Sequence, residues 1–111
     1  MSYRLFIDDE RDPPKGPWIV VRSSAEAIET VKNRGLPFYI SFDHDLGGDD
    51  TSMKFIDWLI EMVLDLRSLG IEMKNIKFPF PDYFIHSQNP VGRDNIRARI
   101  ESFRVYFDLS V

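Results

Sequence analysis

The chain has 111 residues, of which 43% are hydrophobic and 29% are charged, proportions typical of one soluble globular domain. The absence of cysteine excludes disulfide bonds, thiolate chemistry and zinc sites built on cysteine. A formal net charge of −4 argues against an extended surface for nucleic acid or for anionic membranes. We expect a single domain over residues 1–111, located in the cytoplasm because no signal-peptide core or membrane-spanning run is visible.

The first half of the chain alternates short apolar runs with turn-forming segments. Residues 3–7 predict a buried strand, and the proline-rich residues 11–17 predict a loop. A second strand is expected over residues 18–21. A helix is expected over residues 23–35, where a serine and a glutamate three positions later have the spacing of a capping box. Residues 38–42 predict a third strand.

The second half continues the alternation. Residues 49–52 offer several caps for a second helix, in which apolar side chains recur at helical spacing. Residues 72–81 are expected to form a proline-broken connection, and residues 83–85 a fourth strand. A last helix is expected to begin at Asn89–Pro90 or at Asp94. Strands that alternate with helices predict an α/β fold with a mostly parallel four-stranded sheet.

The connection between the first two predicted strands leaves an alternative open. Parallel neighbours usually need a crossover of a dozen or more residues, and residues 8–17 show no helix. An extended segment that spans about 3.3 Å per residue is long enough to return along the sheet. An antiparallel first strand would instead place Asp8 and Asp9 at the edge opposite the other polar groups.

Polar side chains follow directly after three of the four predicted strands. Ligands of open parallel sheets bind beyond the carboxyl ends of the strands, so we expect a functional site at this edge. These side chains are Asp8, Asp9, Asp43, His44, Asp45, His86 and Ser87.

The four aspartates of this group, Asp8, Asp9, Asp43 and Asp45, are candidate metal ligands. A carboxylate cluster without cysteine favours Mg²⁺ or Mn²⁺, and a histidine ligand would shift the preference toward Mn²⁺ or another transition metal. Asp45 is alternatively a residue that orients a histidine ring. The competing interpretation is a set of solvated loop acids and helix caps.

The two histidines, His44 and His86, are candidate catalytic residues because each directly follows a predicted strand. Imidazole titrates near neutral pH, so a pair can serve as general base and general acid. Cleavage of a phosphodiester needs a base for the attacking water and an acid for the leaving oxygen. The alternative is that each ring bonds to the backbone at a strand end. A reaction that uses the histidines without a metal also remains open.

Ser87, Asn89 and Arg93 are candidate phosphate ligands at the start of the last helix. A helix N-terminus attracts phosphate, and an arginine adds a two-pronged contact. Arg93 is alternatively a surface arginine paired with an acid. Three further arginines are expected to form the solvated face of this helix: Arg97, Arg99 and Arg104.

Four segments of the chain resemble a known family when they are taken together. They are LFIDDERDPP (5–14), WIVVRSSAEA (18–27), ISFDHDLGG (40–48) and HSQNPVGRDNI (86–96). In this order they resemble the cyclic-phosphate-processing receiver-like domain family, a divergent branch of the response-regulator receiver fold, over about residues 3–106. The resemblance implies a three-layer, flavodoxin-like sandwich with helices on both faces of the sheet and with the first receiver helix missing.

The resemblance also suggests roles for individual residues. Asp8 and Asp9 resemble the acidic metal-binding pair of receivers, and Asp43 or Asp45 falls where the phospho-accepting aspartate would lie. Ser87 resembles the hydroxyl residue of the fourth receiver strand. An ordinary receiver does not need the two histidines, and no clear strand carries the receiver's lysine. These departures make signalling through an aspartyl phosphate less expected than phosphoester chemistry.

The expected function is therefore that of a metal-assisted phosphoesterase, a hydrolase that acts on cyclic phosphates. Its expected substrates are RNA 2′,3′-cyclic phosphate ends or cyclic nucleotides, so its partner is a small-molecule nucleotide or an RNA 3′ end. Two alternatives stay open: a non-catalytic module that binds a nucleotide or phosphate, and a phospho-receiver signalling domain.

Overall fold

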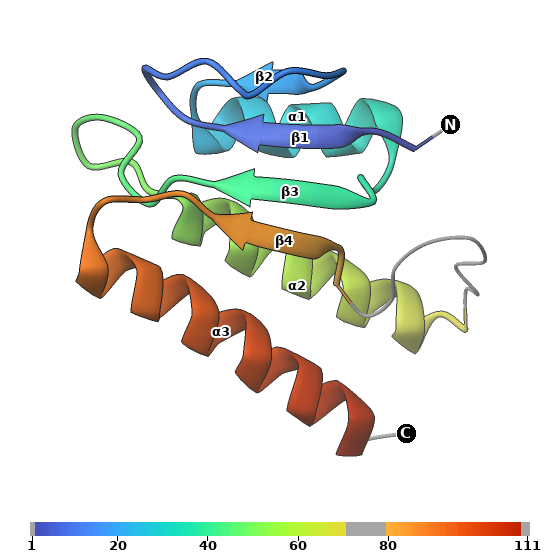
Figure 1. Ribbon diagram of the computed structural model, residues 1–111. Coiled ribbons are helices and arrows are strands. Elements are labelled where there is room, and N and C mark those ends of the chain that lie inside the picture. The colour runs from blue at the N-terminus through green and yellow to red at the C-terminus, as the bar shows by residue number, and fades with distance from the viewer. Residues whose placement is uncertain (1, 71–79, 110–111) are drawn as a thin grey trace.

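The computed structural model describes residues 2–70 and 80–109, which form one sheet and three helices (Figure 1). The predicted connection over residues 72–81 lies almost wholly outside the described residues. In chain order the elements are β1 (Arg4–Ile7), β2 (Ile19–Val21), α1 (Ser24–Arg34), β3 (Tyr39–Phe42), α2 (Ser52–Ser68), β4 (Asp82–Ile85) and α3 (Pro90–Leu109).

The four strands are all parallel and follow the order β2-β1-β3-β4. Leu5 of β1 lies opposite Ile19 of β2 and Ile40 of β3, so the first strand pairs on both sides. The antiparallel alternative is therefore wrong, because the proline-rich link between β1 and β2 runs back along the sheet without forming a helix. The carboxyl ends of all four strands consequently meet at one edge.

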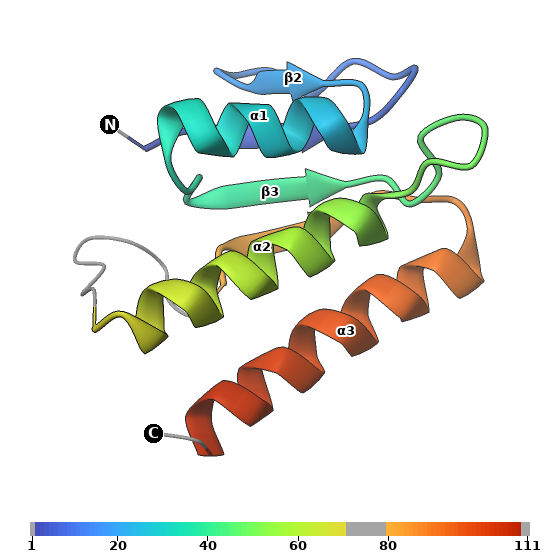
Figure 2. The same ribbon diagram turned by 180° about the vertical axis from the view of Figure 1, so that it is seen from behind.

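The three helices pack on one face of the sheet, where Leu5 and Ile7 of β1 and Ile40 and Phe42 of β3 are buried (Figures 1 and 2). The α/β receiver-like fold is thus confirmed, but within the described ranges the expected helix layer on the second face is absent. The crossovers from β2 to β3 and from β3 to β4 run in the same direction across the sheet. Right-handed crossovers in one direction place their helices on the same face, and the reverse step from β1 to β2 contains no helix.

The second face of the sheet is covered only in part, by the link between β1 and β2. Trp18 from this link packs against Phe6 and Tyr39, with ring centroids 5.7 and 6.0 Å apart. Phe84 on β4 stays 57% exposed. One side of the sheet is therefore a closed core, whereas the other side is partly open.

Asp50 joins the loop between β3 and α2 to the start of α1. Its carboxylate accepts hydrogen bonds from the Ser24 N–H at 2.8 Å and from the Ser24 hydroxyl at 2.5 Å. Burial alone would raise the pKa of Asp50, but the bonds from Ser24 and the charge of Lys54 outweigh burial and lower it. Because the N-terminus of a helix attracts negative charge, the ionised form fixes this loop beside the sheet edge.

We predict that Asp50→Asn lowers the free energy of unfolding at pH 7 by about 1 kcal/mol, the usual size of an N-terminal helix contact. The folded-state pKa of Asp50 lies below its unfolded value, so its contribution is present above the unfolded pKa and is lost as pH falls through the folded pKa. Urea unfolding at pH 7 and in acid should therefore show a difference only at pH 7. Asn at the exposed neighbour Asp49 is the control. A difference that persists unchanged in acid would contradict this assignment.

Candidate functional site

The candidate site lies where β1, β3 and β4 end. The strand register aligns Ile7, Phe42 and Ile85. The pairing continues one step further, because the Asp43 N–H donates to the Ile7 carbonyl and the His86 N–H donates to the Phe42 carbonyl, each at 2.9 Å. Asp8, Asp43 and His86 each offer a ligand atom, and these atoms lie within 4.8 Å of one another. The parallel sheet thus brings together residues from three distant segments.

The imidazole of His86 is held on three sides. Its Nε2 lies 3.0 Å from Asp8 Oδ2, and its Nδ1 lies 2.7 Å from Ser41 Oγ. The ring stacks on Phe6, with centroids 4.6 Å apart and planes 2° apart. An ionised carboxylate only accepts hydrogen bonds, so in the neutral ring Nε2 carries the proton and the Ser41 hydroxyl donates to Nδ1. The surrounding strands therefore select both the orientation and the tautomer of this ring.

Asp8 is a buried carboxylate, with 1% of its surface exposed. Its Oδ1 accepts hydrogen bonds from the N–H groups of Glu10 at 2.9 Å and Arg11 at 2.8 Å. Burial would raise the pKa of Asp8, but these two backbone bonds, the bond from His86 and the charge of Arg11 together lower it. Asp8 is consequently an ionised group at neutral pH, fixed at the end of a central strand.

Arg11 is a site residue to which the sequence pattern gave no role. Its guanidinium lies 3.2 Å from Asp8 Oδ2 and 3.7 Å from Asp43 Oδ2. An aspartate that accepts backbone N–H groups two and three positions later turns the chain back on itself, and this turn brings Arg11 over both acids. The side chain is 46% exposed, so it can move aside.

A cavity of about 410 Å³ opens beside this cluster. Asp9, Asp43 and Asp45 line it together with Ser87, so the structure gathers three of the four predicted metal ligands at one opening. The Asp9 carboxylate lies close to the backbone of Gly47, because a Cβ added at Gly47 would be 3.4 Å from Asp9 Oδ2. Asp43 belongs to the tight group with Asp8 and His86, whereas ligation by Asp9 and Asp45 stays a prediction.

His44 occupies a different position from His86. Its Nδ1 lies 2.9 Å from Asp45 Oδ1, and a Cβ added at Gly92 would come within 2.4 Å of its side chain. Hydrogen bonds from His44 and then from Asn89 lower the pKa of Asp45. His44 therefore packs beneath the first turn of α3 and does not line the acidic cavity. Its catalytic role stays a prediction.

The three predicted phosphate ligands lie at or just before the first turn of α3. The helix begins at Pro90, and the Asn89 side chain caps it by accepting the Gly92 N–H at 3.1 Å. Ser87 Oγ accepts the Asn89 N–H at 3.1 Å. The N–H of Arg93 donates to the Asn89 carbonyl at 2.9 Å, whereas its exposed side chain makes no hydrogen bond or ion pair with the part of the chain that is described. Ser87 and Arg93 are thus free to contact an anion, whereas the carbonyl oxygen of the Asn89 side chain is already engaged.

The donor set suits a small divalent cation. Two carboxylates and one imidazole are ligands that Mn²⁺ accepts, and the carboxylates alone suit Mg²⁺. Arg11 supplies positive charge to the same two acids, so a cation and this guanidinium would compete for them. If His86 Nε2 ligated the ion, its hydrogen bond to Asp8 would have to break.

Three comparisons with known proteins bear on this site. Searches of curated proteins and of solved structures found no match. Among the described residues, no helix is both long and apolar enough to cross a membrane. The model of a family described as "Cyclic-phosphate processing Receiver domain" matches residues 3–102, which include every predicted site residue. The chain therefore belongs to the cyclic-phosphate processing receiver domain family.

Proposed function

We propose that the protein is a hydrolase that opens cyclic phosphodiesters and that His86 moves the protons of the reaction. The observation that carries this proposal is the buried array in which Asp8 fixes one nitrogen of His86 and Ser41 faces the other. An imidazole oriented by a carboxylate is suited to general acid–base work. Ser87, which directly follows His86, and Arg93 line one hollow with His86 and are the proposed contacts for phosphate oxygens.

The hydrogen bonds of His86 indicate which of its ring nitrogens accepts a proton during the reaction. Asp8 keeps the proton on Nε2, so Nδ1 is the nitrogen that accepts a proton, and Asp8 stabilises the imidazolium that results. In hydrolysis, a bond forms between phosphorus and the water oxygen while one ring ester bond breaks. The proton taken from water returns from His86 to the leaving oxygen. The Ser41 hydroxyl holds Nδ1 in place until the reacting oxygen arrives.

The acids beside His86 are the proposed cation ligands. Asp8 and Asp43 would hold Mg²⁺ or Mn²⁺, with Asp9 and Asp45 as further ligands, and the bound ion would polarise the phosphate and favour attack by water. Arg11 contacts Asp8 and Asp43 and balances their charge when no ion does so. His44, held by Asp45, is the residue we predict to share the acid–base work.

The first prediction from this proposed function concerns His86. His86→Ala should reduce kcat for 2′,3′-cyclic nucleotides by about 10²–10⁴-fold, the usual contribution of a positioned acid or base. The measurement is turnover of a panel of 2′,3′-cyclic and 3′,5′-cyclic nucleotides by chromatography, with unfolding curves to show that the variant folds. His44→Ala is the matched variant, and a comparable loss of kcat would place it in the reaction.

Other results would favour the alternative functions. Tight binding of a cyclic nucleotide by the wild-type protein without turnover would favour a binding module. A mass increase on Asp43 or Asp45 after incubation with acetyl phosphate would favour a phospho-receiver. Full activity of His86→Ala would contradict the proposed mechanism directly.

The second prediction concerns Ser41 as a positioning residue. Ser41→Ala should lower kcat by about 10–100-fold and leave KM nearly unchanged, because the hydroxyl orients His86 and does not contact the substrate. Ser41→Thr keeps the hydroxyl on a strand, where β-branched residues are accommodated, and should recover most of the activity. A rise in KM with constant kcat, or no rescue by threonine, would count against this role.

The third prediction concerns Arg11 and metal affinity. Arg11→Ala should tighten Mn²⁺ binding by on the order of tenfold, the amount by which a neighbouring charge typically alters proton binding. Isothermal titration of the metal-free protein with Mn²⁺ measures this directly. Arg11→Lys retains the charge and should bind Mn²⁺ about as weakly as the wild-type protein. Weaker binding by Arg11→Ala would show that the guanidinium does not compete with the ion.

A further inference from the structure

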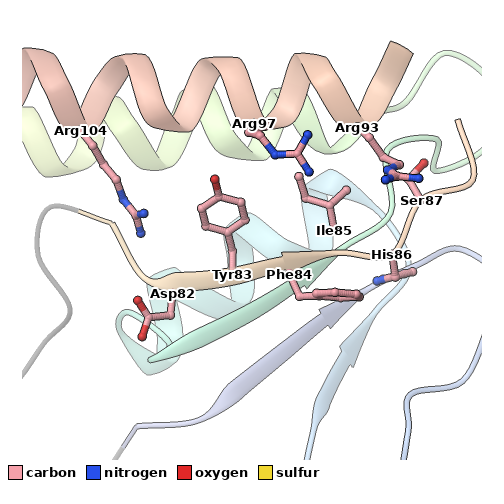
Figure 3. A pocket seen from close by; sticks show the side chains of 9 residues that line it. All are labelled: Asp82, Tyr83, Phe84, Ile85, His86, Ser87, Arg93, Arg97 and Arg104. Atoms are coloured by element: carbon pink, nitrogen blue, oxygen red, sulfur yellow. The ribbon is translucent and has the colours of Figure 1, made fainter. Parts of the chain in front are cut away.

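β4 is the outermost strand of the sheet, and among the described residues one of its edges has no partner strand. A hollow of about 790 Å³ runs along this edge (Figure 3). Consecutive residues from Asp82 to Ser87 line it, although successive side chains of a strand point to opposite faces. The hollow is therefore a groove beside the backbone of β4, which we call the edge groove, and not a pocket on one face of the sheet.

The backbone of β4 directs hydrogen-bonding groups into the edge groove. The His86 N–H donates to the Phe42 carbonyl, so the backbone groups of His86 and, two positions earlier, of Phe84 face β3. Because backbone groups of successive residues face opposite sides of a strand, those of Tyr83 and Ile85 face the groove. A row of such groups at a sheet edge is a template for pairing with another strand.

The opposite wall of the edge groove is positively charged. Figure 3 shows the side chains of Arg93, Arg97 and Arg104 extending from α3 toward β4. Arg97 and Arg104 thus line a groove rather than an open helix face, which corrects the expectation for these two residues. Asp82 is the one acid among the described residues that line the groove, so three cations face one carboxylate in a chain whose net charge is −4.

Two of the three arginines are available to a ligand. The side chain of Arg93 has no hydrogen bond or ion pair with the described residues. The ion pair between Arg97 and Asp94 is long, at 3.6 Å, and the Arg97 side chain is 53% exposed. Arg104 is already engaged by a carboxylate, a backbone carbonyl and an aromatic ring, so it contributes charge but no free contact.

The spacing of the two available arginines matches that of an extended peptide. Arg93 and Arg97 are separated by about 6 Å along the axis of α3, from the rise of 1.5 Å per residue. Side chains on one face of a strand recur every second residue, about 6.6 Å apart. A strand paired with Tyr83 and Ile85 would therefore place acidic side chains two positions apart beside the two guanidinium groups. In this mode of recognition, backbone pairing supplies affinity and side-chain contacts supply specificity.

We propose that the edge groove binds an extended acidic segment of a partner protein, which pairs with β4 as an additional strand of the sheet. A second copy of this chain is disfavoured as the occupant, because pairing two β4 edges would bring their arginine rows together. An oligonucleotide is disfavoured because the Phe84 ring points away from the arginines and offers no stacking surface between them (Figure 3). The groove ends at Ser87, which also lines the acidic cavity, so the bound segment would lie directly beside the candidate site.

The test uses a fluorescent peptide of about ten residues in which glutamate and valine alternate, long enough to span the groove at about 3.3 Å per residue. Fluorescence anisotropy should show saturable binding to the wild-type protein. A peptide with lysine in place of glutamate should bind more weakly by on the order of tenfold or more, because it is repelled by the arginines. A peptide with the same side chains but an N-methylated backbone should also bind more weakly, because it lacks the N–H donors that pair with β4.

Protein variants test the contribution of the arginines. Arg97→Ala should weaken binding of the glutamate peptide by on the order of tenfold, the effect of one lost charge-assisted hydrogen bond. Arg99→Ala is the matched control, because it removes the same charge from α3 but Arg99 pairs with Asp57 outside the groove. It should leave binding unchanged. An equal loss of affinity in both variants would show that only the net charge matters and would overturn the proposal.

Amide hydrogen exchange locates the bound peptide. In the free protein, the N–H groups of Tyr83 and Ile85 should exchange faster than that of His86, which is bonded to β3. Saturating peptide should slow the exchange of Tyr83 and Ile85. Unchanged exchange at these two positions would overturn the proposal, as would equally tight binding of the N-methylated peptide or of a tetrauridylate. A dimer of the free protein that the peptide dissociates would assign the edge to a second copy instead. None of these measurements requires turnover, so absence of hydrolysis would leave this proposal standing.

Discussion

The hydrogen bond between Asp8 and His86 is the constraint on which the rest of the site depends. A buried carboxylate is costly unless it is hydrogen-bonded, and Asp8 satisfies this condition with two backbone N–H groups, an imidazole and a guanidinium. These partners come from its own turn and from β4, on the far side of β3. The bond is therefore possible only because the parallel register ends the three strands at the same level.

Much of the site could be predicted because each central strand is an apolar run that stops at a polar residue. Once the sheet is parallel, Asp8, Asp43 and His86 must meet, and the sequence pattern named all three. Ser41 was missed because it lies inside an apolar strand and contacts a residue 45 positions away. Arg11 was missed because a proline-rich segment reads as a loop, and nothing in its spacing shows that Asp8 folds it back.

The arrangement of helices illustrates a different limit. Hydrophobic periodicity located α1, α2 and α3, and of the residues it placed inward Ile28 is only partly buried. The others are buried: Ala27, Val31, Ile56, Leu59, Ile60, Val63, Ile96, Ile100, Phe103 and Phe107. Periodicity does not reveal the order of strands in the sheet, and that order decides which face each crossover covers. For the same reason it could not show that the edge of β4 stays open and that Arg97 faces it.

The separation of Asp8 and His86 by 78 positions has a consequence for synthesis of the chain on the ribosome. β1 lies inside the sheet but is translated first, and β4 joins the outer edge as the last strand described. Until β4 has emerged, Asp8 lacks its imidazole neighbour, and closing so long a loop requires the other strands to be docked already. A nascent or truncated chain that stops before β4 lacks His86 and therefore cannot assemble the cluster of Asp8, Asp43 and His86.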